Sequence, residues 1–257
     1  MDFIKRIFIR LYSTYGFFIF GLLFILLFPF FLVFILLNDK HPFVFTLNRI
    51  WAYLFFKLIF IPVEVVYEEK LPKNGQYIFC ANHTSYLDIP IIGYLNYKAA
   101  FIGKSSLAKV PIFGFMFRRI HITVDRKKLR SRSEAIKRAF DVLGKGVSLI
   151  FFPEGGIISK NPPALANFKD GAFRAAIEKQ IPVVPVTIPF NWIILPDDNK
   201  FLLNWRKAKI VVHKPIVADN ADAATVKLVK EKTFEVIYNE LSKHYPPEQL
   251  EMKQNEG

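Results

Sequence analysis

The residues in this sequence that are best suited to chemistry follow a short apolar run. Residues 77–81 have the composition of a buried strand, and they give way abruptly to the polar residues 82–85, with Asp88 shortly after. If His83 ends the strand and Asp88 lies in the first turn of a following helix, the carboxylate can fold back onto the imidazole. A carboxylate that holds one ring nitrogen leaves the other nitrogen able to take a proton, as in a general base. For this pair alone, a merely structural histidine at a strand end is the favoured alternative.

A second strand delivers another carboxylate. Residues 147–152, apolar except for Ser148, lead into Pro153, Glu154, Gly155 and Gly156, which predict a tight turn. In an open α/β sheet, ligands bind at the carboxyl ends of the strands, where such loops meet. The two stretches together favour a reactive site over a structural histidine.

The chain from residue 63 onward alternates between β-rich and helical segments. Strands are predicted at residues 63–67, 77–81, 99–102, 121–124, 147–152, 183–188 and 208–213, and helices at 89–97, 112–118, 131–143, 171–179 and 223–245. This alternation predicts an α/β domain, residues 63–245, with a mostly parallel sheet flanked by helices on both faces. Residues 246–257 are polar, and we expect this tail to be frayed.

The first 62 residues are predicted to anchor the chain in a membrane. Residues 11–37 carry no charge over 27 positions, and as a helix they would run about 40 Å, more than the roughly 30 Å of a bilayer core. The stretch is too long for a signal peptide, and Pro29 should kink or break the helix. Residues 42–62 are aromatic but contain Arg49 and Lys57, which favours an interfacial helix, with a buried core helix as the alternative. The anchor is therefore a helical hairpin, or a span plus an interfacial helix.

Composition points to a membrane surface as the partner. The 257 residues are 52% hydrophobic, include 28 Phe and carry a formal net charge of +13, which favours an anionic lipid surface. The aromatic residues lie mainly in the membrane segments and not among the basic ones, so we expect no nucleic acid partner. The single cysteine, Cys80, lies in a predicted strand and is expected to be a buried apolar residue. No Cys/His spacing typical of zinc is present, so no metal is predicted.

The positive charge is concentrated in one segment. Residues 98–138 hold twelve Lys or Arg against two acidic residues, a net +10. A solvated helix face explains most of them. Lys104 and Arg126 differ because each follows a predicted strand, at the same edge as His83 and Glu154. A solvated helix face explains these two residues less well.

These stretches together resemble the glycerolipid acyltransferase family, the PlsC-type lysophosphatidate acyltransferases. The family's first motif, Asn-His plus four residues plus Asp, is matched by Asn82, His83 and Asp88, and its third motif begins Phe-Pro-Glu-Gly, matched by residues 152–155. The second motif region is matched by Lys104, Gly114 and Asp125-Arg126. Residues 168–171 match a Phe-Lys-x-Gly turn of the family, and residues 181–186 match its fourth motif. The resemblance covers residues 77–188.

The resemblance implies a membrane-bound O-acyltransferase of phospholipid biosynthesis. His83, oriented by Asp88, would take the proton from the hydroxyl of lysophosphatidate, whose oxygen would attack the thioester of acyl carrier protein or coenzyme A to give phosphatidate. The substrate-binding residues would be Glu154 and Gly155 at the acceptor's glycerol, and Lys104, Arg126 and Lys169 at its phosphate. Pro185 would end a wall of the acyl-chain tunnel, with a plain edge-strand proline as the alternative. No metal, cofactor or covalent intermediate is implied, and the domain would face the cytoplasm at the cytoplasmic membrane.

Two departures leave the acceptor open. The family usually continues its third motif with Thr-Arg-Ser, whereas this chain has Gly156, Ile157, Ile158 and Ser159, so an arginine expected at the acceptor phosphate is absent. His121 stands where a glycine is usual. The alternative acceptors are glycerol 3-phosphate, a lysophospholipid or a lyso-aminolipid. A non-enzymatic basic membrane-binding protein is the other alternative, although it would need neither motif.

Overall fold

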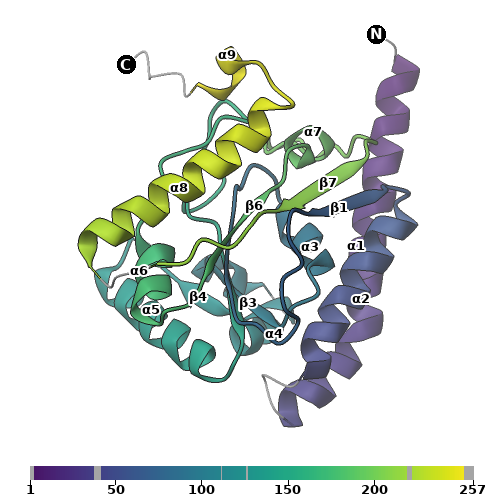
Figure 1. Ribbon diagram of the computed structural model, residues 1–257. Helices are drawn as coiled ribbons and strands as arrows, with labels where there is room; N and C mark the ends of the chain where they lie inside the picture. The colour runs from purple at the N-terminus through teal and green to yellow at the C-terminus, as the bar shows by residue number, and fades with distance from the viewer. Residues whose placement is uncertain (1–2, 38–41, 111, 126, 219–221, 252–257) are drawn as a thin grey trace.

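A seven-stranded sheet lies at the centre of the protein. The computed structural model describes residues 3–37, 42–110, 112–125, 127–218 and 222–251. The strands are β1 (Val63–Tyr67), β2 (Ile78–Ala81), β3 (Ala99–Lys104), β4 (Ile122–Val124), β5 (Ser148–Phe151), β6 (Val183–Thr187) and β7 (Ala208–Val212). They lie in the order β1-β7-β6-β2-β5-β3-β4, and every neighbouring pair is parallel except β6 and β7 (Figure 1). The predicted mostly parallel α/β sheet is confirmed.

Helices cover both faces of this sheet. They are α1 (Phe3–Leu37), α2 (Pro42–Leu58), α3 (Asp88–Ile91), α4 (Phe113–Ile120), α5 (Leu129–Gly144), α6 (Gly171–Glu178), α7 (Asn191–Ile194), α8 (Ala223–Ser242) and α9 (Pro247–Leu250), with 3-10 turns η1 (Ile92–Tyr94) and η2 (Ser105–Lys109). In Figure 1, α1 and α2 lie along one side of the sheet and α8 crosses the other. The short elements α7, α9 and η2 were not predicted, because a single turn shows no helical periodicity.

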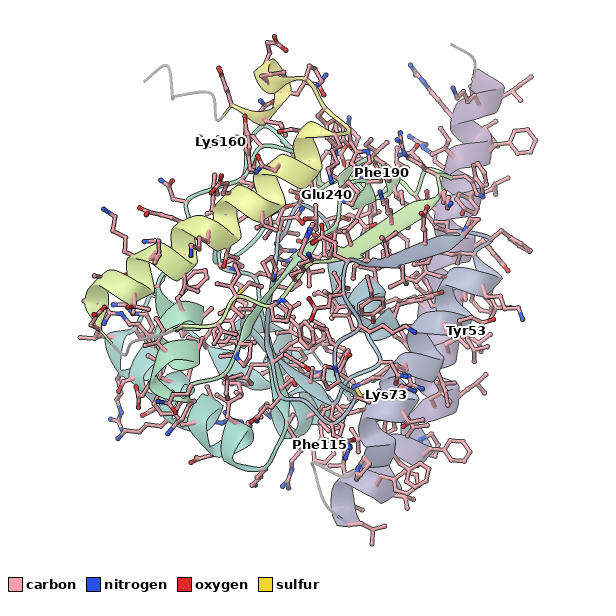
Figure 2. All side chains as sticks on the ribbon, viewed as in Figure 1. Tyr53, Lys73, Phe115, Lys160, Phe190 and Glu240 are labelled. Carbon is pink, nitrogen blue, oxygen red and sulfur yellow. The ribbon has the colours of Figure 1, made fainter. Side chains whose placement is uncertain are left out.

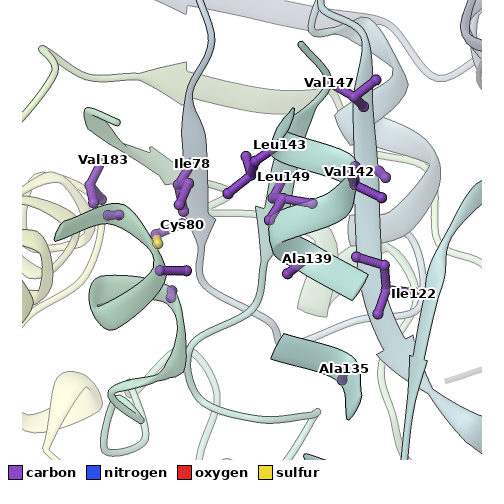
Figure 3. Packing of buried hydrophobic residues seen from close by; sticks show 14 of the residues in the cluster. Ile78, Cys80, Ile122, Ala135, Ala139, Val142, Leu143, Val147, Leu149 and Val183 are labelled. Carbon is purple, nitrogen blue, oxygen red and sulfur yellow. The ribbon is translucent and has the colours of Figure 1, made fainter. Parts of the chain in front are cut away.

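Alternation along the central strands divides the core into two clusters. In β2, Ile78 and Cys80 face one cluster, which includes Ala139 and Val142 of α5 (Figure 3). Phe79 and Ala81 face the other, as side chains of a strand alternate between faces. All four residues of β2 are fully buried, which explains why the strand reads as a continuous apolar run. Cys80 is thus the buried apolar residue that was expected, and burial raises the pKa of its thiol.

The first two helices form an antiparallel hairpin packed against the sheet domain. One side of α1 contributes Ile19 and Leu23 to the second cluster, together with Phe55 and Phe56 of α2. The opposite side is exposed and apolar; its exposed residues include Phe3, Phe8, Leu11, Phe18, Ile25, Leu26, Phe30 and Leu36. Figure 2 shows Tyr53 of α2 on the outer side of the hairpin, where it is 53% exposed. Among the described helices, α1 alone is long and apolar enough to cross a membrane.

Two expectations about this architecture were wrong. The chain does not break at Pro29, because α1 continues to Leu37. Proline removes one backbone hydrogen bond, and packing of the flanking turns against α2 and the core keeps the helix continuous. The start of the C-terminal tail is also not frayed, since α9 buries Leu250 against the first cluster.

Candidate active site

The loop after β2 wraps around the carboxylate of Asp88. His83 Nδ1 lies 3.0 Å from Asp88 Oδ2, and the backbone N–H groups of Thr84 and Ser85 donate to the same oxygen, each at 2.8 Å. Asp88 is fully buried at the first residue of α3, so the predicted return of the carboxylate from the first helical turn is what the structure contains. The imidazole is therefore held through one nitrogen by a carboxylate that the loop itself fixes.

A residue that the sequence analysis missed holds the other oxygen of Asp88. Asn191, at the start of α7, donates its Nδ2–H to Asp88 Oδ1 at 3.0 Å. Asn191 is itself fully buried, and its Oδ1 has no hydrogen-bond partner among the described residues. The available signal was a polar amide within the otherwise apolar residues 188–195. A buried polar group in such a run needs a partner, but the sequence does not say which one.

Asn82 ties the start of the same loop to a neighbouring strand. Its Nδ2–H donates to the carbonyl of Ile188 at 3.0 Å, and its Oδ1 accepts from the N–H of Ile188 at 2.7 Å. Ile188 directly follows β6, which pairs with β2 in the sheet. The side chain of Asn82 thus continues the strand pairing one step beyond the end of β2.

The ring of His83 lies flat against Phe152. The two ring centroids are 3.9 Å apart with an interplanar angle of 17°, and Phe152 also stacks with Phe101 at a centroid distance of 6.2 Å. A carboxylate can only accept, so a neutral imidazole hydrogen-bonded to it through Nδ1 has its lone pair on Nε2. Nε2 has no hydrogen-bond partner in the described parts of the chain, and the His83 side chain is 10% exposed. This arrangement can accept a proton from a substrate hydroxyl.

Glu154 has a different environment from the one expected. The residue is fully buried; its Oε1 accepts from the N–H of His83 at 2.7 Å, and its Oε2 accepts from the N–H of Ala166 at 2.9 Å. Both oxygens are therefore engaged by backbone, and the expected contact with the acceptor is not open to this side chain in the structure. Burial raises the pKa of Glu154 to about 7, against the two backbone hydrogen bonds, which lower it. Its carboxylate braces the loop that carries His83.

The turn after Glu154 requires a glycine. Gly155 has φ of +94°, which disfavours an L side chain, and a Cβ there would lie 2.6 Å from Nζ of Lys169. The N–H of Lys169 also donates to the carbonyl of Pro153 at 2.8 Å. Lys169 is exposed, so its ammonium lies against the turn and open to solvent. This brings one predicted phosphate-binding residue to the candidate site.

The remaining predicted residues fall into three cases. Lys104 is exposed at the end of β3, at the same sheet edge as the loops after β2 and β5. Arg126 lies outside the described residues. Pro185 is buried in β6, which is an interior strand between β2 and β7, so the edge-strand alternative was wrong. It is tolerated there because the pairing of β6 with β7 begins only at Val186.

Several backbone N–H groups beside His83 donate within the loop, which limits their use for binding an oxyanion. Those of Thr84 and Ser85 donate to Asp88, and that of Leu87 donates to Ser85 Oγ at 3.2 Å. The N–H of Asp88 donates to the carbonyl of Ser85 at 3.1 Å. The start of α3 therefore serves the carboxylate of Asp88 first.

Comparison with known proteins places this site in a family. The Acyltransferase family model matches residues 62–189, a range that holds every predicted site residue but not Asn191. A chloroplastic 1-acyl-sn-glycerol-3-phosphate acyltransferase of Brassica napus is 30% identical over 205 residues, 73% of this chain and 58% of that protein. A lyso-ornithine lipid O-acyltransferase of Pseudomonas aeruginosa is 27% identical over 137 residues, 53% of this chain and 52% of that protein.

A solved structure shares the fold. The crystal structure of the 1-acyl-sn-glycerophosphate acyltransferase PlsC from Thermotoga maritima superposes with a TM-score of 0.74, covering 93% of this chain and 97% of that chain at 24% identity. The chain spans a little more than half the length of the curated relatives named above. The match to the family model, the relatives and the shared fold agree, and the chain belongs to the acyltransferase family.

Proposed function

We propose that the protein transfers an acyl chain from a thioester to the free hydroxyl of lysophosphatidate, giving phosphatidate. The observation that carries the proposal is the His83–Asp88 pair, with Nδ1 hydrogen-bonded inside the loop and Nε2 without a partner among the described residues. The name of the Brassica relative supports the choice of acceptor. The donor is acyl carrier protein or coenzyme A carrying the acyl thioester.

In this mechanism the proton moves through one nitrogen. Nε2 of His83 removes the proton from the acceptor hydroxyl as the oxygen attacks the thioester carbonyl, and Asp88 stabilises the imidazolium that forms. The tetrahedral intermediate collapses with cleavage of the carbon–sulfur bond, and the imidazolium returns its proton to the departing thiolate. The products are an ester and a free thiol, and His83 is regenerated neutral.

Glu154 acts in this mechanism through the backbone. Its carboxyl fixes the N–H of His83 and thereby the position of the ring, so it is a positioning residue. The acceptor's phosphate is bound by cations at the same sheet edge, namely Lys104, Arg126 and Lys169. Lys169 has the best supported position of the three because its Nζ lies against the Gly155 turn.

A lyso-aminolipid is the second candidate acceptor. Ile157 offers no hydrogen-bond donor at the position where the family's arginine is expected, and the Pseudomonas relative is named for a lyso-ornithine lipid. A site with fewer cations suits an acceptor without a terminal phosphate. Replacing Ile157 by arginine would improve lysophosphatidate turnover only if the native acceptor is of this second kind.

We further propose that the α1–α2 hairpin enters one leaflet and returns, which leaves the catalytic domain on the cytoplasmic face of the cytoplasmic membrane. The support is the exposed apolar side of α1, together with the packing of the hairpin's other side on the sheet domain. A hairpin puts both termini on one side, in agreement with basic Lys5, Arg6 and Arg10 and a basic domain. Cysteine labelling at residues 2 and 252 should report the same side, and opposite sides would require a true span.

The test is thiol release by the purified protein in detergent or vesicles. Acyl-coenzyme A and acyl carrier protein are each supplied with lysophosphatidate, a lyso-aminolipid, glycerol 3-phosphate or no acceptor. We expect thiol release only when an acceptor is present, fastest with lysophosphatidate. Fast release with the lyso-aminolipid alone would change the acceptor but not the reaction, and release without acceptor would contradict acyl transfer.

A further inference from the structure

A polar pocket opens on the edge of the sheet opposite His83. Its volume is about 360 Å³, and its polar lining includes Thr46 and Arg49 of α2, Lys73 and Asn74 before β2, and Asn96 and Lys98 before β3. Ser148, the first residue of β5, closes the inner side. The pocket therefore lies between the first half of α2 and the sheet.

The strand directions separate this pocket from the candidate active site. Lys73, Lys98 and Ser148 precede or open parallel strands β2, β3 and β5, whereas His83 and Glu154 follow the ends of β2 and β5. A four-residue strand such as β2 spans about 13 Å. A ligand in the pocket therefore does not occupy the position of the acyl acceptor.

The charge around the pocket is of one sign. Arg49, Lys73 and Lys98 line it, and no Asp or Glu is among the lining residues. Within the described parts of the chain, none of these three cations forms an ion pair. Lys209 and Lys243, by contrast, both form ion pairs with Glu240. Three unneutralised cations around one polar cavity are a site for an anion.

The groups present suit a phosphate. A guanidinium can donate two parallel hydrogen bonds to phosphate oxygens, and ammonium groups add charge from any direction. The side-chain amides of Asn74 and Asn96 and the hydroxyl of Thr46 supply further donors. Arg49 is half-buried, so its side chain is the least mobile of the three cations.

We propose that this pocket binds a phosphate group, carried by a phospholipid headgroup or by a soluble ligand. The position favours a lipid, because α2, which lines the pocket, also carries exposed Phe43, Ile50 and Tyr53, and Figure 2 shows Lys73 next to this helix. The lipid source rests on the membrane association proposed for the hairpin. The binding itself does not rest on the proposed acyl transfer.

Two triple variants with equal charge separate a built site from general attraction. The pocket variant carries Arg49→Gln, Lys73→Gln and Lys98→Gln; the control carries Lys137→Gln, Lys214→Gln and Lys232→Gln, three exposed cations outside the pocket. Circular dichroism, and acyl transfer assayed in chloride buffer without inorganic phosphate, check that both remain folded and active. Loss of three charges is the same in each variant, so a difference between them reports the pocket.

The soluble arm measures thermal unfolding of the full chain in inorganic phosphate against chloride at equal ionic strength. We expect phosphate to raise the Tm of the wild type and of the control by about 3 °C near saturation, and not that of the pocket variant. The lipid arm measures flotation with phosphatidylcholine vesicles, with and without 30 mol% phosphatidylglycerol (about one lipid in three). For each protein we compare the affinity for vesicles with and without phosphatidylglycerol. The gain in affinity that phosphatidylglycerol gives should be about tenfold smaller in the pocket variant than in the control.

A response in either arm that only the pocket variant loses supports the proposal. The arm in which it occurs shows whether the phosphate belongs to a lipid headgroup or to a soluble ligand. Equal losses in both variants would overturn it, since attraction would then be general. A phosphate response that the pocket variant retains would overturn it as well, because the ligand would lie elsewhere. Absence of any response of the wild-type protein in both arms would also overturn the proposal. Unchanged acyl transfer in the pocket variant keeps this outcome separate from the proposed function.

Discussion

Two histidine–carboxylate pairs at strand ends, His83–Asp88 and His213–Glu68, differ in what surrounds the second ring nitrogen. His83 Nδ1 lies 3.0 Å from Asp88, and His213 Nδ1 lies 2.9 Å from Glu68. In the second pair, Nε2 of His213 is 2.8 Å from the hydroxyl of Thr187, which is fully buried. Hydroxyl, imidazole and carboxylate thus follow one another as in a hydrolase triad, but inside the sheet.

The carboxylates differ as well. Asp88 is buried and accepts from two backbone N–H groups, from His83 and from Asn191. The Glu68 side chain is 36% exposed, and its contact with His213 is not aligned as a hydrogen bond. His213 follows β7 and Glu68 follows β1, so this pair joins strand ends. The comparison teaches that a short distance between imidazole and carboxylate does not define a catalytic pair; a reachable second nitrogen and a fixed carboxylate do.

The largest predicted difference comes from removing each histidine. His83→Ala should lower turnover by at least about 10²–10⁴, the usual contribution of a general base, with the fold intact. His213→Gln should leave turnover per folded molecule within about threefold, because no substrate reaches Nε2, and should lower the Tm by removing a buried contact. Thiol release and thermal unfolding are measured on both. Similar losses of turnover in the two variants would break the comparison.

The next difference concerns the second anchor of Asp88. Asn191→Ala removes the donor to Oδ1 and should lower kcat about tenfold, the value of one buried hydrogen bond near 1.4 kcal/mol, with KM little changed. Asn204→Ala is the matched control, since Asn204 Nδ2 donates to Ile193 of α7 and does not contact Asp88. An equal loss of kcat in Asn204→Ala would assign the effect to α7 and not to the carboxylate.

Replacing Glu154 tests whether its buried carboxyl group positions the loop that carries His83 or contacts the acceptor. A glutamine at 154 has only one accepting oxygen for the N–H groups of His83 and Ala166, so one buried N–H loses its partner. Glu154→Gln should lower the free energy of unfolding by about 1–3 kcal/mol and lower kcat, while the KM for lysophosphatidate stays within about twofold. A KM that rises tenfold with unchanged stability would restore direct acceptor binding.

The smallest predicted effect is the dependence of the stability of Glu154→Gln on pH. The pKa of Glu154 is raised from 4.5 to about 7 by burial, so folding takes up a proton between these values. The contribution of this group to stability is therefore fully present below pH 4.5 and is lost as the pH rises through 7, by at most about 3 kcal/mol. The free energy of unfolding of Glu154→Gln should therefore fall short of the wild-type value by less at about pH 8 than at about pH 5. These two pH values lie on either side of the pKa of about 7. Urea unfolding at both pH values measures it; a deficit that grows would contradict the raised pKa.

Much of the architecture could be predicted from the sequence because apolar alternation is local. All seven strands were located within a few residues, and the return of Asp88 to His83 followed from placing one at a strand end and the other in a helix.

Asn191 could not be predicted, because it is 103 residues from its partner and lies on a single helical turn. For Glu154 the sequence predicts a carboxylate in a turn, whereas the two backbone N–H groups that donate to it are visible only in the structure. The His213 pair was missed because Glu68, Thr187 and His213 come from three strands brought together by the sheet order.

The central claim is that Asp88 fixes His83 with its hydrogen on Nδ1 and its lone pair on Nε2. The measurement that tests it most directly is nitrogen NMR of protein labelled with ¹⁵N at histidine, with His83→Gln used to assign the signal. At a pH where the ring is neutral, we predict a protonated Nδ1 and an unprotonated Nε2 for His83, a preference that Asp88→Asn weakens or reverses. A neutral His83 with its hydrogen on Nε2 in the wild-type protein would contradict the account, because that nitrogen could then not accept the proton of the acceptor.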